Sequence, residues 1–312
     1  MTTAPNAGQD ARAARHEWIW LILLLMVLGA GWGVTQPMAK IAVSEGYRHL
    51  GILFWQQALG AVFLGAICAA RRLPLRRDRA ALLFYLYIAL IGSVLPGIAG
   101  YEAARFLPSG WLSLLLSTVP LFAFPIALAL GIDRFAWARF AGLSLGLGGV
   151  ALLAAPWSDS GAGVSLIWIG VALIPPFLYA IEGNSVAKFG TAGLDPVQLL
   201  FGASLTGAVI TAPLAVATGT WIDPRPPWNA PDGAIVVSSM VHALVYASYV
   251  WLVGRAGSVF AAQVSYLVTG FGVMWAILLL GESYGAAFWG ALALMLAGMT
   301  LVRPRTRRTA PA

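Results

Sequence analysis

Residues 257–282 read GSVFAAQVSYLVTGFGVMWAILLLGE, and this stretch decides the fold class. It begins with small and weakly polar residues, has Thr269-Gly270-Phe271-Gly272 near its centre, and ends in an apolar run before Gly281-Glu282. A helix needs about 20 mostly apolar residues to cross a bilayer. The stretch therefore predicts a membrane-spanning helix.

An earlier stretch, residues 109–133, is a weak copy of the first and reads SGWLSLLLSTVPLFAFPIALALGID. Pro120 and Thr269 are 149 positions apart, and so are Asp133 and Glu282. A repeat of roughly half the chain is typical of membrane transporters. The matches therefore predict that the chain arose by internal duplication.

The composition excludes an ordinary soluble protein. Of the 312 residues, 60% are hydrophobic and 10% are charged, whereas a soluble domain carries about 25% charged residues. The single cysteine, Cys68, excludes an intramolecular disulfide, and the three histidines form no cluster with metal-ligand spacing. We therefore expect a polytopic membrane protein with no metal site and no cofactor.

Apolar segments occupy most of the chain. They lie at about 18–42, 50–70, 80–101, 106–131, 135–154, 164–186, 196–218, 233–253, 258–280 and 285–302. We expect an all-α polytopic membrane protein with ten transmembrane helices, arranged as two inverted five-helix repeats. The connections are short and leave no room for a soluble catalytic domain.

The expected domains follow from these segments. They are a cytoplasmic tail at 1–17, a first repeat at 18–154, a second, inverted repeat at 155–302 and a basic cytoplasmic tail at 303–312. Five spans in each half is an odd number, so the second half enters the membrane upside down relative to the first.

Lysine and arginine are distributed unevenly among the connections. With the N-terminus placed inside, fifteen of the nineteen lie on the inner side and four on the outer side. Cytoplasmic connections carry an excess of positive charge, which predicts that both termini are cytoplasmic and that the protein lies in the cell inner membrane. The net charge of +7 comes from short runs between apolar segments, a pattern that favours contact with anionic lipid over nucleic acid.

Several motifs resemble a known family. Tyr101-Glu102-Ala103-Ala104, followed by residues 109–133, resembles the first half-repeat of EamA-like transporters in the drug/metabolite transporter superfamily. Residues 254–282 resemble the second half, and Gly31-Trp32-Gly33 with Lys40 resembles the start of the first. The resemblance spans residues 18–302 and implies a ten-helix inverted-repeat fold that often exports small metabolites such as amino acids.

Two positions differ from the pattern of that family. Asp133 stands where the first half often has Glu, which is a mild chemical change. Thr269-Gly270 stands where the second half often has Pro, which predicts a ninth helix less kinked than the fourth.

His242 lies near the middle of the span 233–253 and therefore near the bilayer midplane. An ionisable side chain at that depth is costly and generally faces a cavity or a partner. Two interpretations are open. His242 carries a proton or binds a substrate carboxylate, or it is a neutral histidine that is hydrogen-bonded between helices.

Glu182 lies in the inner third of the sixth span, after Pro175-Pro176. A double proline leaves backbone carbonyls without donors, which is tolerated where they line a cavity. Glu182 is therefore either a gate or proton site on the cytoplasmic side, or a carboxylate close enough to the interface to pair with Lys188 or reach water.

Other charged residues favour structural roles. Glu102 and Arg105 are three residues apart and can share a helical face, where a surface ion pair is favoured over an outer gate. Glu282 and Asp133 each precede a span, where capping of the next helix is favoured over transport chemistry.

Aromatic and amide side chains are candidates for lining a substrate path. The candidates are His242, Tyr246, Tyr249, Gln263, Tyr266, Trp32, Gln36, Trp55, Tyr101 and Tyr179. His242, Tyr246 and Tyr249 can share one helical face, as can Gln263 and Tyr266. For each one, the alternative is packing between helices with a satisfied polar tip.

These features favour a secondary transporter that moves a small metabolite, an amino acid or related amphipathic compound, by alternating access. Proton coupling through His242 or Glu182 and uncoupled facilitation are both open, as is the oligomeric state. The alternatives are a membrane enzyme acting on lipid and a membrane scaffold or sensor that transports nothing. Because the charges are scattered, no set of converging acids and bases indicates an enzyme.

Overall fold

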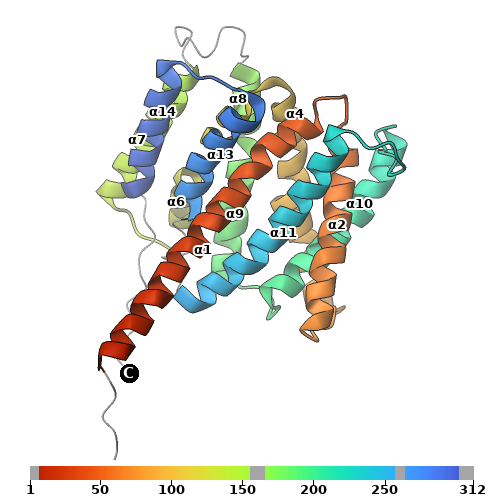
Figure 1. The fold of residues 1–312 in the computed structure, drawn as a ribbon, viewed down its shortest axis with the longest axis horizontal. Helices are drawn as coiled ribbons and strands as arrows, with labels where there is room; N and C mark the ends of the chain where they lie inside the picture. Colours follow the sequence, from red (N-terminus) through yellow and green to blue (C-terminus); the bar gives the residue numbers. More distant parts are fainter. Residues whose placement is uncertain (1–6, 155–165, 257–263, 302–312) are drawn as a thin grey trace, which may run out of the picture.

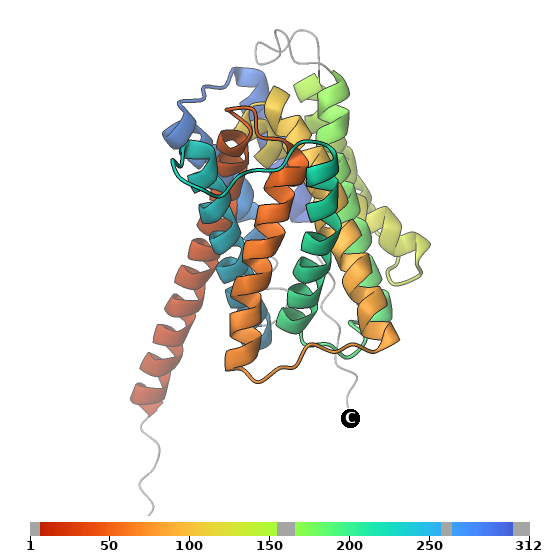
Figure 2. The same cartoon turned by 90° about the vertical axis from the view of Figure 1, so that its right-hand side faces the viewer.

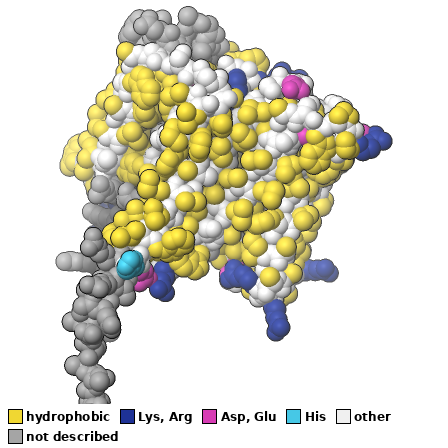
Figure 3. Space-filling model, in the orientation of Figure 1, with side chains coloured by type: hydrophobic (Ala, Val, Ile, Leu, Met, Phe, Trp, Pro, Cys, Tyr) yellow, Lys and Arg dark blue, Asp and Glu magenta, His cyan; other side chains and the backbone are white. Residues whose placement is uncertain are grey.

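The computed structural model describes residues 7–154, 166–256 and 264–301, and the described chain is helical without strands. Eight helices are long and apolar enough to cross a membrane, and two shorter apolar helices, Val264–Leu280 and Ala286–Leu301, follow them. The protein is therefore an all-α polytopic membrane protein of about ten spans. Figure 3 shows the middle of one face covered by hydrophobic side chains, with charged side chains gathered toward its two ends.

The helices of the first half are connected in sequence by short segments. They are α1 (Ala7–Ala42), α2 (His49–Ala70), α3 (Arg79–Tyr87), η1 (Ile88–Val94), α4 (Leu95–Phe106), α5 (Ser109–Leu116), α6 (Val119–Ala129) and α7 (Trp137–Ala154). The predicted tail of residues 1–17 is thus helical from Ala7 onward, because its Ala, Arg and Gln residues favour helix and continue α1.

The helices of the second half follow the same order. They are α8 (Leu166–Ala172), α9 (Ile174–Phe189), α10 (Pro196–Ala217), α11 (Ala230–Ala256), α13 (Val264–Leu280) and α14 (Ala286–Leu301). Connections 43–48, 107–108, 218–229 and 281–285 lie at one end of the bundle, which we call the upper end (Figures 1 and 2). Connections 71–78, 130–136 and 190–195 lie at the opposite, lower end, where α1 begins.

Three spans depart from a continuous α-helix. The third span widens into the π-helix η1 between α3 and α4, and Pro96 follows it. The fourth is interrupted at Ser117-Thr118 before Pro120, and the sixth at Leu173 before Pro175-Pro176. Proline lacks an N–H and cannot accept the helical geometry at the preceding turn, which explains the two interruptions.

The ninth span differs from the fourth as the sequence predicts. Helix α13 runs without interruption from Val264 to Leu280, through Thr269-Gly270. The second half therefore lacks, over its described residues, the interruption that Pro120 introduces in the first.

The two halves of the chain make nearly the same helix contacts: most contacts of a span in one half recur for the corresponding span of the other half. Helix α2 packs along α10, and α7 along α14; each of these pairs joins the same span of the two halves. The contact of α1 with α13 matches that of α9 with α6, and the contact of α1 with α11 matches that of α9 with α4 and η1. Such pairing is what two copies of one repeat produce around a twofold axis.

Glycine allows the close approach of α7 and α14. A Cβ added at Gly149 would lie 2.8 Å from Cγ of Met295 and 3.0 Å from the carbonyl oxygen of Ala291. Gly146 is buried, and a Cβ added there would meet Leu121 of α6, whereas Gly148 faces outward with nothing within 4 Å of an added Cβ. Of the predicted glycine face, Gly146 and Gly149 thus pack between helices and Gly148 does not, because its position places it on the far side of the helix.

Candidate functional site

Helix α11 has one apolar outer side and one polar inner side. The exposed apolar side chains on its outer side are Val237, Met240, Leu244 and Trp251. Because a helix turns about 100° per residue, His242, Tyr246 and Tyr249 lie on the opposite side. They therefore face the interior of the bundle and not the membrane.

Trp32 of α1 meets these three side chains from across the interior. Its ring centroid lies 6.3 Å from that of His242, 6.3 Å from that of Tyr246 and 5.3 Å from that of Tyr249. The rings of His242 and Tyr246 are stacked at 6.5 Å. One helix of each half thus contributes to a single aromatic cluster at the middle of the spans.

Glu182 of α9 projects toward the same depth. Its carboxylate lies against Gly92 in η1, so that a Cβ added at Gly92 would lie 2.7 Å from Oε1 and 2.8 Å from Oε2. Gly92 is at the midpoint of the third span, Arg79–Phe106. The side chain therefore carries the carboxylate upward from the inner third of its own span to mid-depth.

Two tyrosines lie near this carboxylate, and one of them belongs to the aromatic cluster. Tyr179 and Tyr246 both lie within electrostatic range of Glu182. Tyr246 also contacts Trp32 and His242, so one side chain belongs to both groups. We call the six residues Trp32, Tyr179, Glu182, His242, Tyr246 and Tyr249 the central cluster.

The polar atoms of the central cluster have no hydrogen-bond partner among the described residues. Trp32 Nε1 is fully buried and unpaired. The side chains of Glu182, Tyr179, Tyr246 and Tyr249 are only partly buried, and that of His242 is exposed, although all of them lie within the bundle. Since an unpaired polar group in apolar surroundings costs roughly 2–7 kcal/mol, this interior space suits water or a polar ligand.

The alternative role for Glu182, an ion pair with Lys188, is wrong. Lys188 Nζ donates to the carbonyl oxygen of Leu130 at 2.9 Å, at the C-terminus of α6. Neither Lys188 nor any other Lys or Arg of the described chain forms an ion pair with Glu182. Its carboxylate is therefore left free to meet something that enters the interior.

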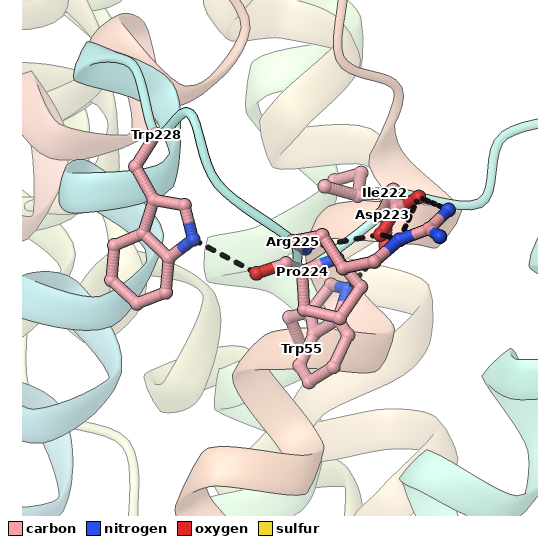
Figure 4. Close-up of polar contacts among 6 residues, drawn as sticks. All are labelled: Trp55, Ile222, Asp223, Pro224, Arg225 and Trp228. Atoms are coloured by element: carbon pink, nitrogen blue, oxygen red, sulfur yellow. Dashed lines mark hydrogen bonds and ion pairs between the residues drawn. The ribbon is translucent and has the colours of Figure 1, made fainter.

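Other predicted path residues lie apart from the central cluster. Trp55 donates through Nε1 to the carbonyl oxygen of Ile222 at 3.0 Å, in the connection before α11 (Figure 4). Tyr266 donates to the carbonyl oxygen of Met299 at 2.7 Å and so joins α13 to α14. The polar tips of both residues are satisfied by packing partners.

The remaining three predicted path residues are Tyr101, Gln36 and Gln263. Tyr101 is buried and donates to Oε1 of Gln56 at 3.2 Å, while lying within electrostatic range of Tyr179. Gln36 is half-buried in α1, one turn above Trp32. Gln263 lies outside the described residues.

The upper end carries the predicted ion pair and a third partner. Arg105 donates to Oε2 of Glu102 at 2.9 Å, and Nδ1 of His49 lies 2.6 Å from Oε1 of the same carboxylate. His49 begins α2, so this group joins the ends of two helices. All three side chains lie at the surface, as expected of an ion pair that holds an end of the bundle.

Glu282 caps a helix, but not the one that the sequence indicates. Its carboxylate accepts from the backbone N–H of Ser109 at 2.7 Å and of Gly110 at 3.1 Å, at the start of α5. Tyr284 donates to the same carboxylate, and burial together with this hydrogen bond raises the pKa of its hydroxyl. The cap therefore joins the second half of the chain to the first, because the fold brings α5 closer than α14.

Asp133 also departs from the expected cap. It forms an ion pair with the buried side chain of Arg139 and accepts from its neighbouring backbone N–H at Arg134, 2.7 Å away.

Lys40, at the same position in the first half as Lys188 in the second, donates to the carbonyl oxygens of Ala104 and Leu107 at 2.7 and 2.9 Å.

Sequence reasoning missed Gly92 and the π-helix around it. The available signal was Gly92 followed by Pro96, four residues on, because Pro96 cannot donate to the Gly92 carbonyl as the helix requires. Single-turn π-helices occur frequently at functional sites, and here the widened turn lies beside the only carboxylate of the central cluster. Among the residues that the structure describes, no group of three or more His, Cys, Asp or Glu side chains could hold a metal ion.

The family of the chain follows from comparison with known proteins. The model of the EamA-like transporter family matches residues 19–155 and again residues 166–303, nearly the whole chain. The chain belongs to the EamA-like transporter family. As an EamA-like protein it is a multi-pass membrane transporter, a class whose members move solutes and are not enzymes.

Two further similarities accompany the family match. The chain is 25% identical over 307 residues to a probable terminal-alkyne amino-acid exporter of Streptantibioticus cattleyicolor, covering 92% of this EamA-like chain and 94% of that one. A solved structure described only as the crystal structure of a protein has a TM-score of 0.63 at 16% identity, with 90% and 95% of the two chains covered. The second similarity concerns the fold alone.

Proposed function

We propose that the protein is a secondary transporter that exports a small amphipathic metabolite, an amino acid or a related compound, across the cytoplasmic membrane. The central cluster carries this proposal. It places unpaired polar groups at mid-depth, between α1 of the first half and α9 and α11 of the second. Substrate sites of repeat transporters lie at that depth and between the repeats.

Alternating access is the mechanism that the arrangement supports best. The helix contacts are nearly unchanged when the halves are exchanged, so two repeats related in this way can rock between two equivalent states. The upper end is held together by Lys40 and by the cap of Glu282 on α5. We propose that these contacts separate when the transporter opens at this end and that the central cluster is then exposed there.

Both chain ends are proposed to be cytoplasmic. The lower end holds Arg71, Arg76, Arg139, Lys188 and Arg255, while the upper end holds the smaller set that includes Lys40 and Arg225. An excess of positive charge is expected on the cytoplasmic side. The lower end then faces the cytoplasm, and both α1 and α14 have their free ends there.

Export of an amino acid is favoured by the relative from Streptantibioticus cattleyicolor, which is named as an amino-acid exporter. The central cluster is compatible with a zwitterion, because it offers one carboxylate, one imidazole and aromatic rings. His242 is proposed to bind the substrate carboxylate or to carry a coupled proton.

Flux through purified protein tests the proposal. Proteoliposomes would be loaded with one radiolabelled amino acid at a time, for each of the common amino acids. Efflux would be compared with that from loaded liposomes that contain no protein, with and without a pH gradient. We expect efflux of at least one amino acid, and His242→Ala should lower it by tenfold or more. If efflux equals that of the protein-free liposomes for every amino acid, amino-acid transport is contradicted. Unchanged efflux in His242→Ala would remove the histidine from the mechanism.

A further inference from the structure

Glu182 has no structural role among the described residues. It accepts no hydrogen bond, caps no helix and forms no ion pair, unlike the carboxylates Glu102, Glu282 and Asp133. It nevertheless lies at mid-depth beside Gly92, where a carboxylate is costly. A residue that adds nothing to folding and is costly to bury is a candidate for direct contact with a ligand.

The surroundings of this carboxylate favour one kind of ligand charge. The central cluster contains aromatic rings and no Lys or Arg. The nearest Lys or Arg along each of its three helices binds elsewhere: Lys40 to Ala104, Lys188 to Leu130 and Arg255 to Glu17. Aromatic faces attract cations within about 6 Å of the ring centroid. Tyr246 lies within electrostatic range of the carboxylate, its ring centroid is 6.3 Å from that of Trp32, and Trp32 is 5.3 Å from Tyr249, so a connected set of ring faces extends from the side of Glu182.

We infer that Glu182 and the rings of Trp32, Tyr246 and Tyr249 form a binding site for the ammonium group of the substrate. The inference deepens the proposed function and rests on it for the identity of the site as a substrate site. A primary ammonium has three donors, which match the two carboxylate oxygens of Glu182 and an adjacent hydroxyl or ring face. The same site is unsuited to a substrate whose only charge is negative.

The π-helix makes room for this group. Since a Cβ at Gly92 would lie 2.7 Å from Glu182 Oε1, glycine leaves room for the carboxylate here, and a larger residue would make the carboxylate shift. The widened turn over Ile88–Val94 and the absence of a side chain at Gly92 act together. Tyr179, one turn before Glu182 on α9, lies within electrostatic range of the carboxylate.

Binding to purified protein in nanodiscs tests the inference with three probes of one carbon skeleton. The probes are L-leucine, its decarboxylated form 3-methylbutylamine and its deaminated form 4-methylpentanoate, measured by isothermal titration. We expect leucine and the amine to bind and 4-methylpentanoate to bind at least tenfold more weakly. Glu182→Gln should weaken binding of the amine by tenfold or more, and Glu182→Asp by less, because it keeps the charge.

Controls separate binding from folding and from transport. Glu102→Gln removes a carboxylate at the upper end and should leave the three affinities unchanged, and all variants should elute as the wild type does in size-exclusion chromatography. Equal binding of the amine by the wild type and Glu182→Gln would overturn the inference, as would failure of the amine to bind the wild type. Binding of the amine without any flux in proteoliposomes would contradict the proposed function and leave the ammonium site in place.

Discussion

Among the described residues, polar side chains have hydrogen-bond partners at the upper end of the bundle and lack them at its centre. At the upper end, Lys40, Glu282, Tyr284 and Glu102 all have partners, and Trp111, Leu107 and Leu114 are fully buried beneath them. In the central cluster, Trp32 Nε1 is buried without a partner, and the described chain shows no hydrogen bond to Glu182 or His242. Paired groups stabilise the fold, whereas unpaired groups at mid-depth cost stability, and we propose that they are retained for a ligand.

The comparison makes a direct prediction. Substitutions at the upper end should change stability more than substrate handling, and substitutions in the centre should do the reverse. Three experiments follow, and the first two have matched controls within the chain.

The largest expected effect is on transport, from Gly92→Ala. The new methyl group would lie 2.7 Å from Glu182 Oε1 and would make the carboxylate shift away from η1. We expect efflux to fall by at least tenfold, with a wild-type elution profile. Gly148→Ala is the control, because nothing lies within 4 Å of its added Cβ, and it should transport normally. Normal efflux in Gly92→Ala would mean that the position of Glu182 does not matter.

The second-largest effect is expected from Lys40→Met, which should lower the free energy of unfolding. This change removes the donor of two charged hydrogen bonds and leaves the carbonyl groups of Ala104 and Leu107 unpaired. We expect a loss of about 2 kcal/mol in the free energy of unfolding, measured by equilibrium unfolding in mixed micelles. Lys188→Met removes one bond at an exposed position and should cost about 0.5 kcal/mol. Equal losses in the two variants would show that the upper end is not specially stabilised.

The smallest effect is expected from Asp223→Asn in the connection before α11 (Figure 4). Arg225 holds the pKa of the Asp223 carboxyl at about 2, below its usual range. Any stabilisation from this pair is therefore fully present above the usual carboxyl pKa and is lost as the pH falls through about 2. Because both side chains are well exposed, we expect the variant to keep the thermal midpoint of the wild type at neutral pH. A measurable shift would assign this connection a larger role in closing the upper end.

The two halves give a second comparison, since equivalent residues have different partners. Lys40 binds the end of the third span, whereas Lys188, its counterpart 148 positions later, binds the end of the fourth. Glu282 caps α5 across the halves, whereas Asp133 pairs with Arg139 nearby in sequence. Identical positions in the repeat thus do not ensure identical contacts, because the two ends of the bundle are packed differently.

Much of the fold could be predicted from local sequence. Apolar length gave the spans, and Pro120 and Pro175-Pro176 gave the interruptions of the fourth and sixth spans, because proline removes a backbone donor wherever it stands. Helical periodicity placed His242, Tyr246 and Tyr249 on one face. The roles of Glu282 and Trp55 were not predictable in this way, because their partners, Ser109 and Ile222, are far away in sequence.

The amino-acid sequence by itself determined that this protein is helical, spans a membrane many times and carries two related halves, because bilayer thickness and helical geometry act on each segment separately. Only the tertiary structure decided that Glu182 reaches mid-depth against Gly92 and that Trp32 meets the face of α11. Those contacts join side chains from separate spans, and their positions depend on how the helices of both halves pack together.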